Sequence, residues 1–134
     1  MRVKTTAEIG RKGERIAARF LRRAGYRIVD RNCHFGKNEL DLIAKNKQYI
    51  VFVEVKTRTA NSLDEFLMRP SDAVDREKRK RTVCAAISYL KESPISLCPR
   101  FDVIEVYLDR TARNRILKIN HIADAFSATG AVRH

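Results

Sequence analysis

Apolar residues recur every three or four positions near the start of the chain, between Glu8 and Ala24, which is the spacing of one helix face. The residues on that face are Ile9, Ile16, Ala17, Phe20, Leu21 and Ala24. Arginines and Lys12 fill much of the remaining surface, and Gly25 follows as a typical helix terminator. The pattern predicts an amphipathic helix with a basic outer face.

The pattern then changes to short apolar runs bounded by polar turns, which favours strands. Strands are predicted at Tyr26–Cys33, Glu39–Ala44, Tyr49–Thr57, Arg100–Leu108 and Arg115–Asn120. A second helix is predicted from Asp72, a candidate N-cap, to Lys91. The segment HIADAF after the last strand is expected to form a short helical turn.

The order α-β-β-β-α-β-β predicts an α/β (mixed α+β) fold, in which helices flank a central mixed β-sheet. The 134 residues suffice for one domain, which we expect to span 1–134 with a loose tail over 125–134. The stretch Ala60–Arg69 has weak periodicity. It is interpreted either as a flap over a substrate or as a flexible insertion.

Composition adds a strong positive charge to this picture. Lys and Arg number 28 against 16 Asp and Glu, which gives a net charge of +12. This charge favours a polyanionic binding partner, with nucleic acid ranked before an anionic membrane surface. The alternative is a basic protein without such a partner. Neither a signal peptide nor a membrane-spanning run is expected. Three separated cysteines argue against a disulfide framework and for the cytoplasm.

Strand alternation places several charged side chains together. On the second predicted strand, Glu39 and Asp41 lie opposite in direction to Leu40 and Leu42, and on the third, Glu54 and Lys56 share the face of Phe52. A turn centred on residues 46–47 would put Asp41 opposite Phe52 and Glu39 opposite Glu54. Three carboxylates and one lysine would then share a face, provided that the register does not slip by one residue.

Clustered carboxylates repel one another and lose solvation, and a divalent cation relieves both costs. A minimal phosphodiester-hydrolase site would hold Mg²⁺ or Mn²⁺ on Asp41 and Glu54, with phosphate oxygens completing the coordination. Lys56 would lie near the attacking water. The alternative is a solvated, salt-bridged hairpin face without chemistry. Glu14, at the edge of the first helix's apolar face, either reaches the same site or pairs with nearby arginines.

The run REKRKR at 76–81 is a second basic feature. On a helix, Lys78 falls toward the sheet, and the other basic residues point outward, where they either bind phosphates or remain a solvated face. His34 and His121 have no partner at metal-ligand spacing and are interpreted as non-catalytic.

With these residues in hand, the chain resembles the YraN-like family of predicted endonucleases. These are similar to archaeal Holliday-junction resolvases within the PD-(D/E)xK, restriction-endonuclease-like superfamily. The resemblance runs through GRKGERIAARFLRRAGY, NELDLIA, VFVEVKTR, DAVDREKRKRT, RFDVIEV and HIADAF, in that order. It implies the restriction-endonuclease-like fold of a mixed sheet flanked by helices.

The resemblance also implies roles for individual residues. Glu14, Asp41, Glu54 and Lys56 match the catalytic set, and Asp41, Glu54 and the Val55 carbonyl match the metal ligands. Glu39 and Lys78 match supporting positions. Two departures from the family pattern are Asn38, where Gly is usual, and His34, where Arg is usual. Residues expected to contact nucleic acid are Arg11, Lys12, Arg15, Arg58, Arg76, Arg79 and Lys80.

The leading hypothesis is therefore a Mg²⁺- or Mn²⁺-dependent endonuclease acting on DNA, with branched or junction DNA as substrate by family analogy. A homodimer is an option, because two strands must be cut. The rival is a non-catalytic nucleic-acid-binding protein that keeps the fold and the charge. A third hypothesis is an adaptor whose basic face binds an acidic protein.

Overall fold

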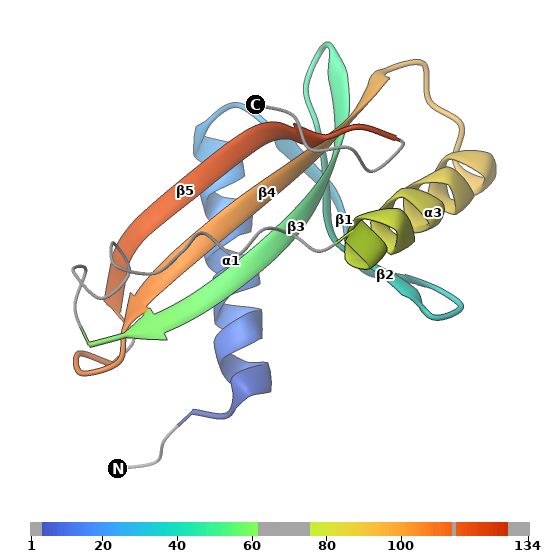
Figure 1. Ribbon diagram of the computed structural model, residues 1–134. Coiled ribbons are helices and arrows are strands. Elements are labelled where there is room, and N and C mark those ends of the chain that lie inside the picture. Colours follow the sequence, from blue (N-terminus) through green and yellow to red (C-terminus); the bar gives the residue numbers. More distant parts are fainter. Residues whose placement is uncertain (1–3, 62–75, 114, 129–134) are drawn as a thin grey trace.

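The computed structural model describes residues 4–61, 76–113 and 115–128 (Figure 1). The elements along the chain are α1 (Thr6–Arg23), β1 (Arg27–Phe35), β2 (Asn38–Lys45), β3 (Tyr49–Ala60), α3 (Arg76–Glu92), β4 (Cys98–Asp109) and β5 (Arg115–Phe126). This confirms the predicted order and a mixed sheet flanked by two helices. The strands lie side by side in the order β1-β2-β3-β4-β5. Only the β3–β4 pair among these strands is parallel.

Both ends of α1 follow from local sequence. Thr5 is the N-cap, and its hydroxyl accepts a hydrogen bond from the Glu8 amide at 3.1 Å. At the other end, Gly25 has φ of +97°, a left-handed conformation that glycine adopts without steric cost. The next amide, of Tyr26, donates to the carbonyl of Leu21 at 2.9 Å and turns the chain into β1.

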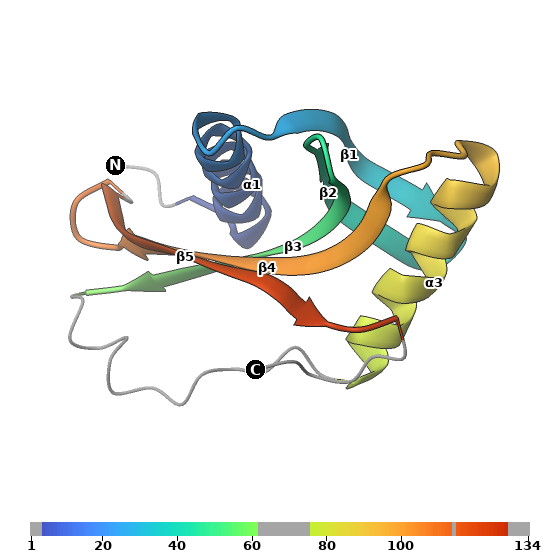
Figure 2. The same ribbon diagram turned by 90° about the horizontal axis from the view of Figure 1, so that it is seen from above.

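The two helices cover opposite faces of the sheet (Figure 2). The α1-side core contains Ile16, Ala17 and Leu21 together with Leu42, Val51, Val53 and Ile104 from the strands. The α3-side core contains Val83 and Ala86 together with Leu40, Phe52, Phe101 and Phe126. Strand β3 is central and contributes alternate residues to both cores.

The register of the β2–β3 hairpin differs from the predicted one by two residues. Ile43, not Asp41, lies opposite Phe52, and the pairing ends at Leu42 with Val53. The difference arises in the turn, because the Asn46 carboxamide accepts from the amides of Gln48 and Tyr49 at 2.9 and 2.7 Å and moves the turn one residue along. An even shift preserves the face of every side chain.

Alternation along β2 fails at one point. Leu40 belongs to the α3-side core and Leu42 to the α1-side core, although both were expected on one face. On the N-terminal side of Leu42, β2 is paired with β1 alone. Two-stranded ribbons of this kind twist more than wide sheets. The twist turns Leu40 toward α3.

The C-terminal segment also differs from expectation. HIADAF is not a helical turn but the second half of β5, which pairs antiparallel with β4 up to Phe101↔Phe126. Ala125 and Phe126 therefore do not belong to a loose tail, and the Phe126 ring stacks on Phe101 with centroids 5.1 Å apart. A positive φ of 52° at Asp124 and a register shift accommodate the segment.

Some predictions fall outside the described residues: the cap at Asp72, most of the 60–69 stretch, and the tail beyond 128. Within the described ranges, no helix is long and apolar enough to cross a membrane. Cys33, Cys84 and Cys98 are free thiols.

Candidate metal and phosphate site

The candidate site lies where β2 and β3 diverge. After Leu42↔Val53 the backbone pairing between these strands stops, and the next inward-pointing amide, of Val55, donates to Asp41 Oδ2 at 2.9 Å instead. The amide and carbonyl of one strand residue point to the same edge, so the Val55 carbonyl also faces this fork. The end of ladder pairing thus leaves a side chain and a backbone carbonyl facing one space.

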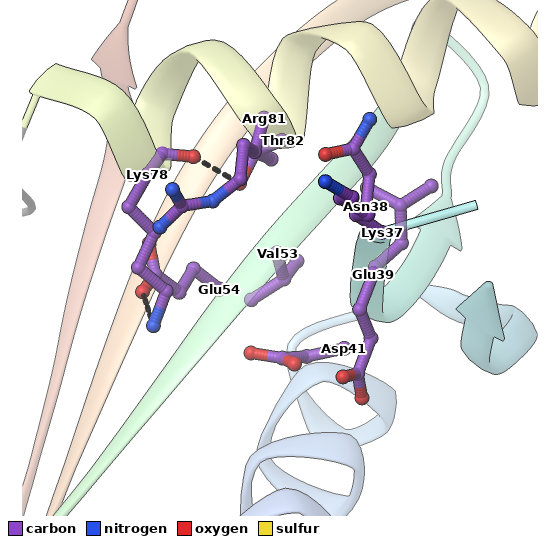
Figure 3. A pocket seen from close by; sticks show the side chains of 10 residues that line it. Lys37, Asn38, Glu39, Asp41, Val53, Glu54, Lys78, Arg81 and Thr82 are labelled. Carbon is purple, nitrogen blue, oxygen red and sulfur yellow. Dashed lines mark hydrogen bonds and ion pairs between the residues drawn. The ribbon is translucent and has the colours of Figure 1, made fainter. Parts of the chain in front are cut away.

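A cavity of about 220 Å³ opens at this fork beneath α3. Its walls are formed by Lys37, Asn38, Glu39, Leu40, Asp41, Val53, Glu54, Lys78, Arg81 and Thr82. Figure 3 shows Glu39 and Asp41 reaching in from β2, Glu54 from β3, and Lys78 and Arg81 from α3. The cavity thus combines carboxylates with basic groups that α3 and the β1–β2 turn supply.

The carboxyl of Asp41 is electrostatically strained. Its pKa is raised from 3.8 to about 6, first by burial and then by the neighbouring charges of Glu14 and Glu54, against the opposing effects of the Val55 amide and Lys78. Burial also raises the pKa of Glu14, with Glu39 adding to the rise and a hydrogen bond to Asn32 opposing it. The structure therefore brings Asp41 within electrostatic reach of Glu14 and Glu54, and Glu14 within reach of Glu39.

Glu54 is the most deeply buried acid of the site, with 3% of its surface exposed. The Lys78 ammonium lies 2.6 Å from its Oε1, yet neither carboxylate oxygen has a hydrogen-bond partner of acceptable geometry among the described residues. The short separation and the missing hydrogen bond describe one contact, which is an ion pair with poor directionality. The Glu54 carboxylate is therefore paired in charge but not hydrogen-bonded among the described residues.

A close helix–strand contact holds Glu14 at the site. Its neighbour Gly13 is buried against β3, where a Cβ atom added to Gly13 would lie 1.8 Å from Thr57 Oγ1. Thr57 in turn follows Lys56, which is half-buried and lies two residues beyond Glu54, on the same face by alternation. Glu14 and Lys56 are not among the cavity-lining residues, although the charge of Glu14 acts on Asp41.

The residues predicted to contact nucleic acid do not form one surface. Arg11, Lys12 and Arg15 lie on α1, across the sheet from Arg76, Arg79 and Lys80 on α3. Lys12 donates to the carbonyl of Arg113 at 3.3 Å, while Arg58 is half-buried on β3. Basic residues therefore flank the sheet on both sides.

Sequence reasoning missed three cavity-lining side chains: Lys37, Arg81 and Thr82. Arg81 belongs to the basic run at 76–81, whose helical phase gave a signal for it. Sequence reasoning also missed a second charged cluster. In it, the buried Asp102 carboxylate accepts a hydrogen bond from Arg100 Nε at 2.9 Å and contacts His121 Nε2 at 2.7 Å. His121 therefore has a partner, on the α1 side of the sheet.

No group of three His, Cys, Asp or Glu side chains at metal-holding distance occurs in the part of the chain that the structure describes. The candidate ligand set is smaller, with two carboxylates and one backbone carbonyl. That set is sufficient for Mg²⁺, which takes one or two carboxylates and keeps several waters.

Comparison with known proteins gives a consistent assignment. Residues 13–106 match the model of a family described as uncharacterised protein family UPF0102. A UPF0102 protein of Caldanaerobacter subterraneus subsp. tengcongensis is 44% identical over 119 residues, which cover 88% of this chain and 93% of the relative. Relatives in Chlorobium phaeobacteroides and Parabacteroides distasonis are 42% and 39% identical, covering 90% of this chain and 94% and 93% of their own lengths. The resemblance found in the sequence motifs is confirmed, and the chain belongs to the UPF0102 (YraN-like) family.

Proposed function

We propose that the chain is a Mg²⁺- or Mn²⁺-dependent endonuclease that hydrolyses phosphodiester bonds in DNA, with branched or junction DNA as its substrate. The observation that carries the proposal is the deeply buried Glu54 carboxylate, which has an ion pair with Lys78 but no hydrogen bond among the described residues, in a cavity shared with Asp41. A buried carboxylate without hydrogen bonds is costly unless a cation neutralises it. The basic groups around the same cavity suit a phosphate substrate.

The donors present fit a hard divalent cation. Asp41 and Glu54 would hold it together with the Val55 carbonyl, since carboxylate, carbonyl and water oxygens suit Mg²⁺ and Mn²⁺. Bound there, the ion would polarise the scissile phosphate. The strain on Asp41, whose pKa rises to about 6 from burial first and acidic neighbours second, also favours a cation, because a positive charge relieves both causes.

The other residues of the chain act around this centre. Lys56 orients the attacking water and offsets the negative charge that develops on the phosphate. Glu14 adds negative potential beside Asp41, as the raised pKa of Asp41 indicates. Lys37 and Arg81, at the edge of the cavity, bind the phosphates that flank the scissile bond. A rigid strand holds Glu54 and Lys56 more precisely than a loop would.

The test is cleavage of labelled linear, flapped and four-way-junction DNA in Mg²⁺, Mn²⁺ or EDTA. Asp41→Asn and Lys56→Met are compared with Lys47→Met and Glu92→Gln, which change exposed charges away from the cavity. We expect metal-dependent cutting that both site variants lose and both controls keep. Paired cuts across a junction would further call for two copies of the chain, which light scattering would detect.

The competing function is a non-catalytic nucleic-acid-binding protein, favoured by the basic residues on both faces of the sheet. It predicts that wild type, Asp41→Asn and Lys56→Met bind DNA equally well and that none of them cuts. Binding to an acidic protein that added DNA does not displace would instead favour the adaptor. Metal-independent cutting, or cutting that survives Asp41→Asn, would overturn the proposed site.

A further inference from the structure

Lys78 occupies an unusual position relative to the proposed site. It lies in the first turn of α3, and its ammonium is 2.6 Å from Oε1 of Glu54. The lysine side chain is 49% exposed, whereas that of Glu54 is 3% exposed. One partner of this ion pair is therefore fixed inside the protein, and the other reaches it from the solvent side.

The buried carboxylate needs a positive charge nearby. An ionised carboxylate removed from water loses much solvation free energy, and removing its ion-pair partner is strongly destabilising. Lys78 provides that charge in the protein without metal. Its carbonyl accepts a hydrogen bond from Thr82 Oγ1 at 3.0 Å, which helps to hold the first turn of α3 over the cavity.

A divalent cation on Asp41 and Glu54 would meet the same ammonium. Two like charges sharing one carboxylate repel each other in a partly buried site. Lysine carries its charge on a flexible four-carbon stem, so the ammonium can leave Glu54 while α3 stays in place. Lys37 and Arg81 are exposed basic residues that line the cavity, and a substrate phosphate held by them would meet the ammonium.

We propose that Lys78 is a displaceable counter-ion that couples metal binding to phosphate binding. It neutralises Glu54 while no metal is bound, and it moves to a phosphate of the nucleic acid when metal takes its place. This inference rests on the proposed metal site and adds a regulation of that site. Because coupling between two ligands is reciprocal, DNA raises the affinity for metal by the same factor by which metal raises the affinity for DNA.

The first experiment measures Mn²⁺ binding by electron paramagnetic resonance. The variants are Lys78→Met and, as a control with the same charge change, Lys91→Met in the exposed last turn of α3. Binding is measured with and without a short oligonucleotide that carries charged, non-hydrolysable phosphonate linkages. Without DNA, we expect Lys78→Met to bind Mn²⁺ about tenfold more tightly than wild type, while Lys91→Met stays within about twofold, since its charge is exposed and screened.

Adding the oligonucleotide should tighten Mn²⁺ binding severalfold in wild type and in Lys91→Met. In Lys78→Met the enhancement should fall clearly below that of Lys91→Met, to the part that direct contact between metal and phosphate supplies, because no ammonium remains to be transferred. Unchanged or weaker Mn²⁺ binding in Lys78→Met, or full coupling without Lys78, would overturn the inference.

A second measurement separates this inference from the proposed function. If wild type binds Mn²⁺ no better than Asp41→Asn does, the proposed metal site is wrong, and the coupling fails with it. The counter-ion role is then decided by urea unfolding in EDTA of Lys78→Met, Glu54→Gln and the double variant. Lys78→Met should destabilise wild type but not the Glu54→Gln background, where no buried charge remains. Equal destabilisation in both backgrounds would show that Lys78 does not neutralise Glu54.

Discussion

Gly13 packs directly against Thr57 of β3, and replacing it by alanine tests how the helix is positioned. In most helices Gly→Ala stabilises the protein by up to about 1 kcal/mol, because glycine has poor helix propensity. At this position the new Cβ would lie 1.8 Å from Thr57 Oγ1, 2.9 Å from its Cβ and 3.0 Å from its Cγ2. Rotation of Thr57 could move Oγ1 and Cγ2 away, but its Cβ is fixed to the backbone. The helix or the strand must therefore shift.

Overpacking of a well-packed core costs about 1–3 kcal/mol, which outweighs the gain in propensity. We therefore expect Gly13→Ala to lower the free energy of unfolding by on the order of 1–2 kcal/mol, and the melting temperature by about 3–8 °C for a domain of this size. Glu14 follows Gly13 directly, so any shift of α1 also displaces it from Asp41. Cleavage, if present, should fall by more than the loss of stability explains.

Urea unfolding monitored by circular dichroism provides the measurement, and the chain supplies its own control. Gly10 is on the same helix, and a Cβ added there meets nothing within 4 Å, so Gly10→Ala should be stabilising. Thr57→Gly removes Cβ together with Oγ1 and Cγ2, so Gly13→Ala should cost at most half as much in the Thr57→Gly background as it does in wild type. Gly13→Ala as stable as Gly10→Ala would refute the argument that this contact limits the position of α1.

Three further outcomes are expected. Asp41→Asn should stabilise the protein in EDTA at pH 8 by on the order of 1–3 kcal/mol, measured by urea unfolding. The folded-state pKa of Asp41 is raised to about 6 by burial and then by Glu14 and Glu54, so the wild-type protein loses stability as pH rises from 3.8 to 6. A gain that persists at pH 3 would contradict this. Asp102→Ala should destabilise the protein by about 3–5 kcal/mol, measured by thermal melting, because it leaves Arg100 without its buried partner. In wild type, burial opposes ionisation of Asp102, but hydrogen bonds from His121 and Arg100 outweigh burial and lower the pKa of Asp102. The stability that Asp102 contributes is therefore present above its ordinary pKa and is lost as pH falls through its lowered pKa. Arg76→Ala/Lys80→Ala should reduce the salt dependence of DNA binding, by about one unit of log–log slope for each phosphate that is no longer neutralised. The reduction should be larger than for Arg11→Ala/Arg15→Ala, because α3 borders the cavity. The reverse ranking would place the DNA across α1.

Much of the fold followed from periodicity. The apolar face of α1 and the alternation in β3 predicted where these elements lie, and Glu54 was expected on the face of Phe52, where it lies. The hairpin register was wrong by two residues, because the Asn46 side chain shaped the turn in a way that apolar spacing does not encode. An error of two leaves the faces unchanged, whereas an error of one would have reversed them.

The remaining differences come from tertiary contacts. HIADAF has no clear strand alternation, and pairing with β4 makes it a strand. The ion pair of Lys78 with Glu54 and the cluster of Asp102 with His121 join residues 24 and 19 positions apart in sequence. Charge and spacing along one element cannot predict which element will lie opposite.

The hydrogen bond from the Val55 amide to Asp41 Oδ2, 2.9 Å long, has a practical consequence. The preceding rungs between β2 and β3 join backbone to backbone, but this proton is held by a side chain that titrates. The nitrogen and proton resonances of one amide in the middle of the sheet therefore report the charge on Asp41 directly. A single cross-peak in an NMR spectrum becomes an indicator of occupancy at the fork, readable without a substrate, a label on the ligand or any turnover.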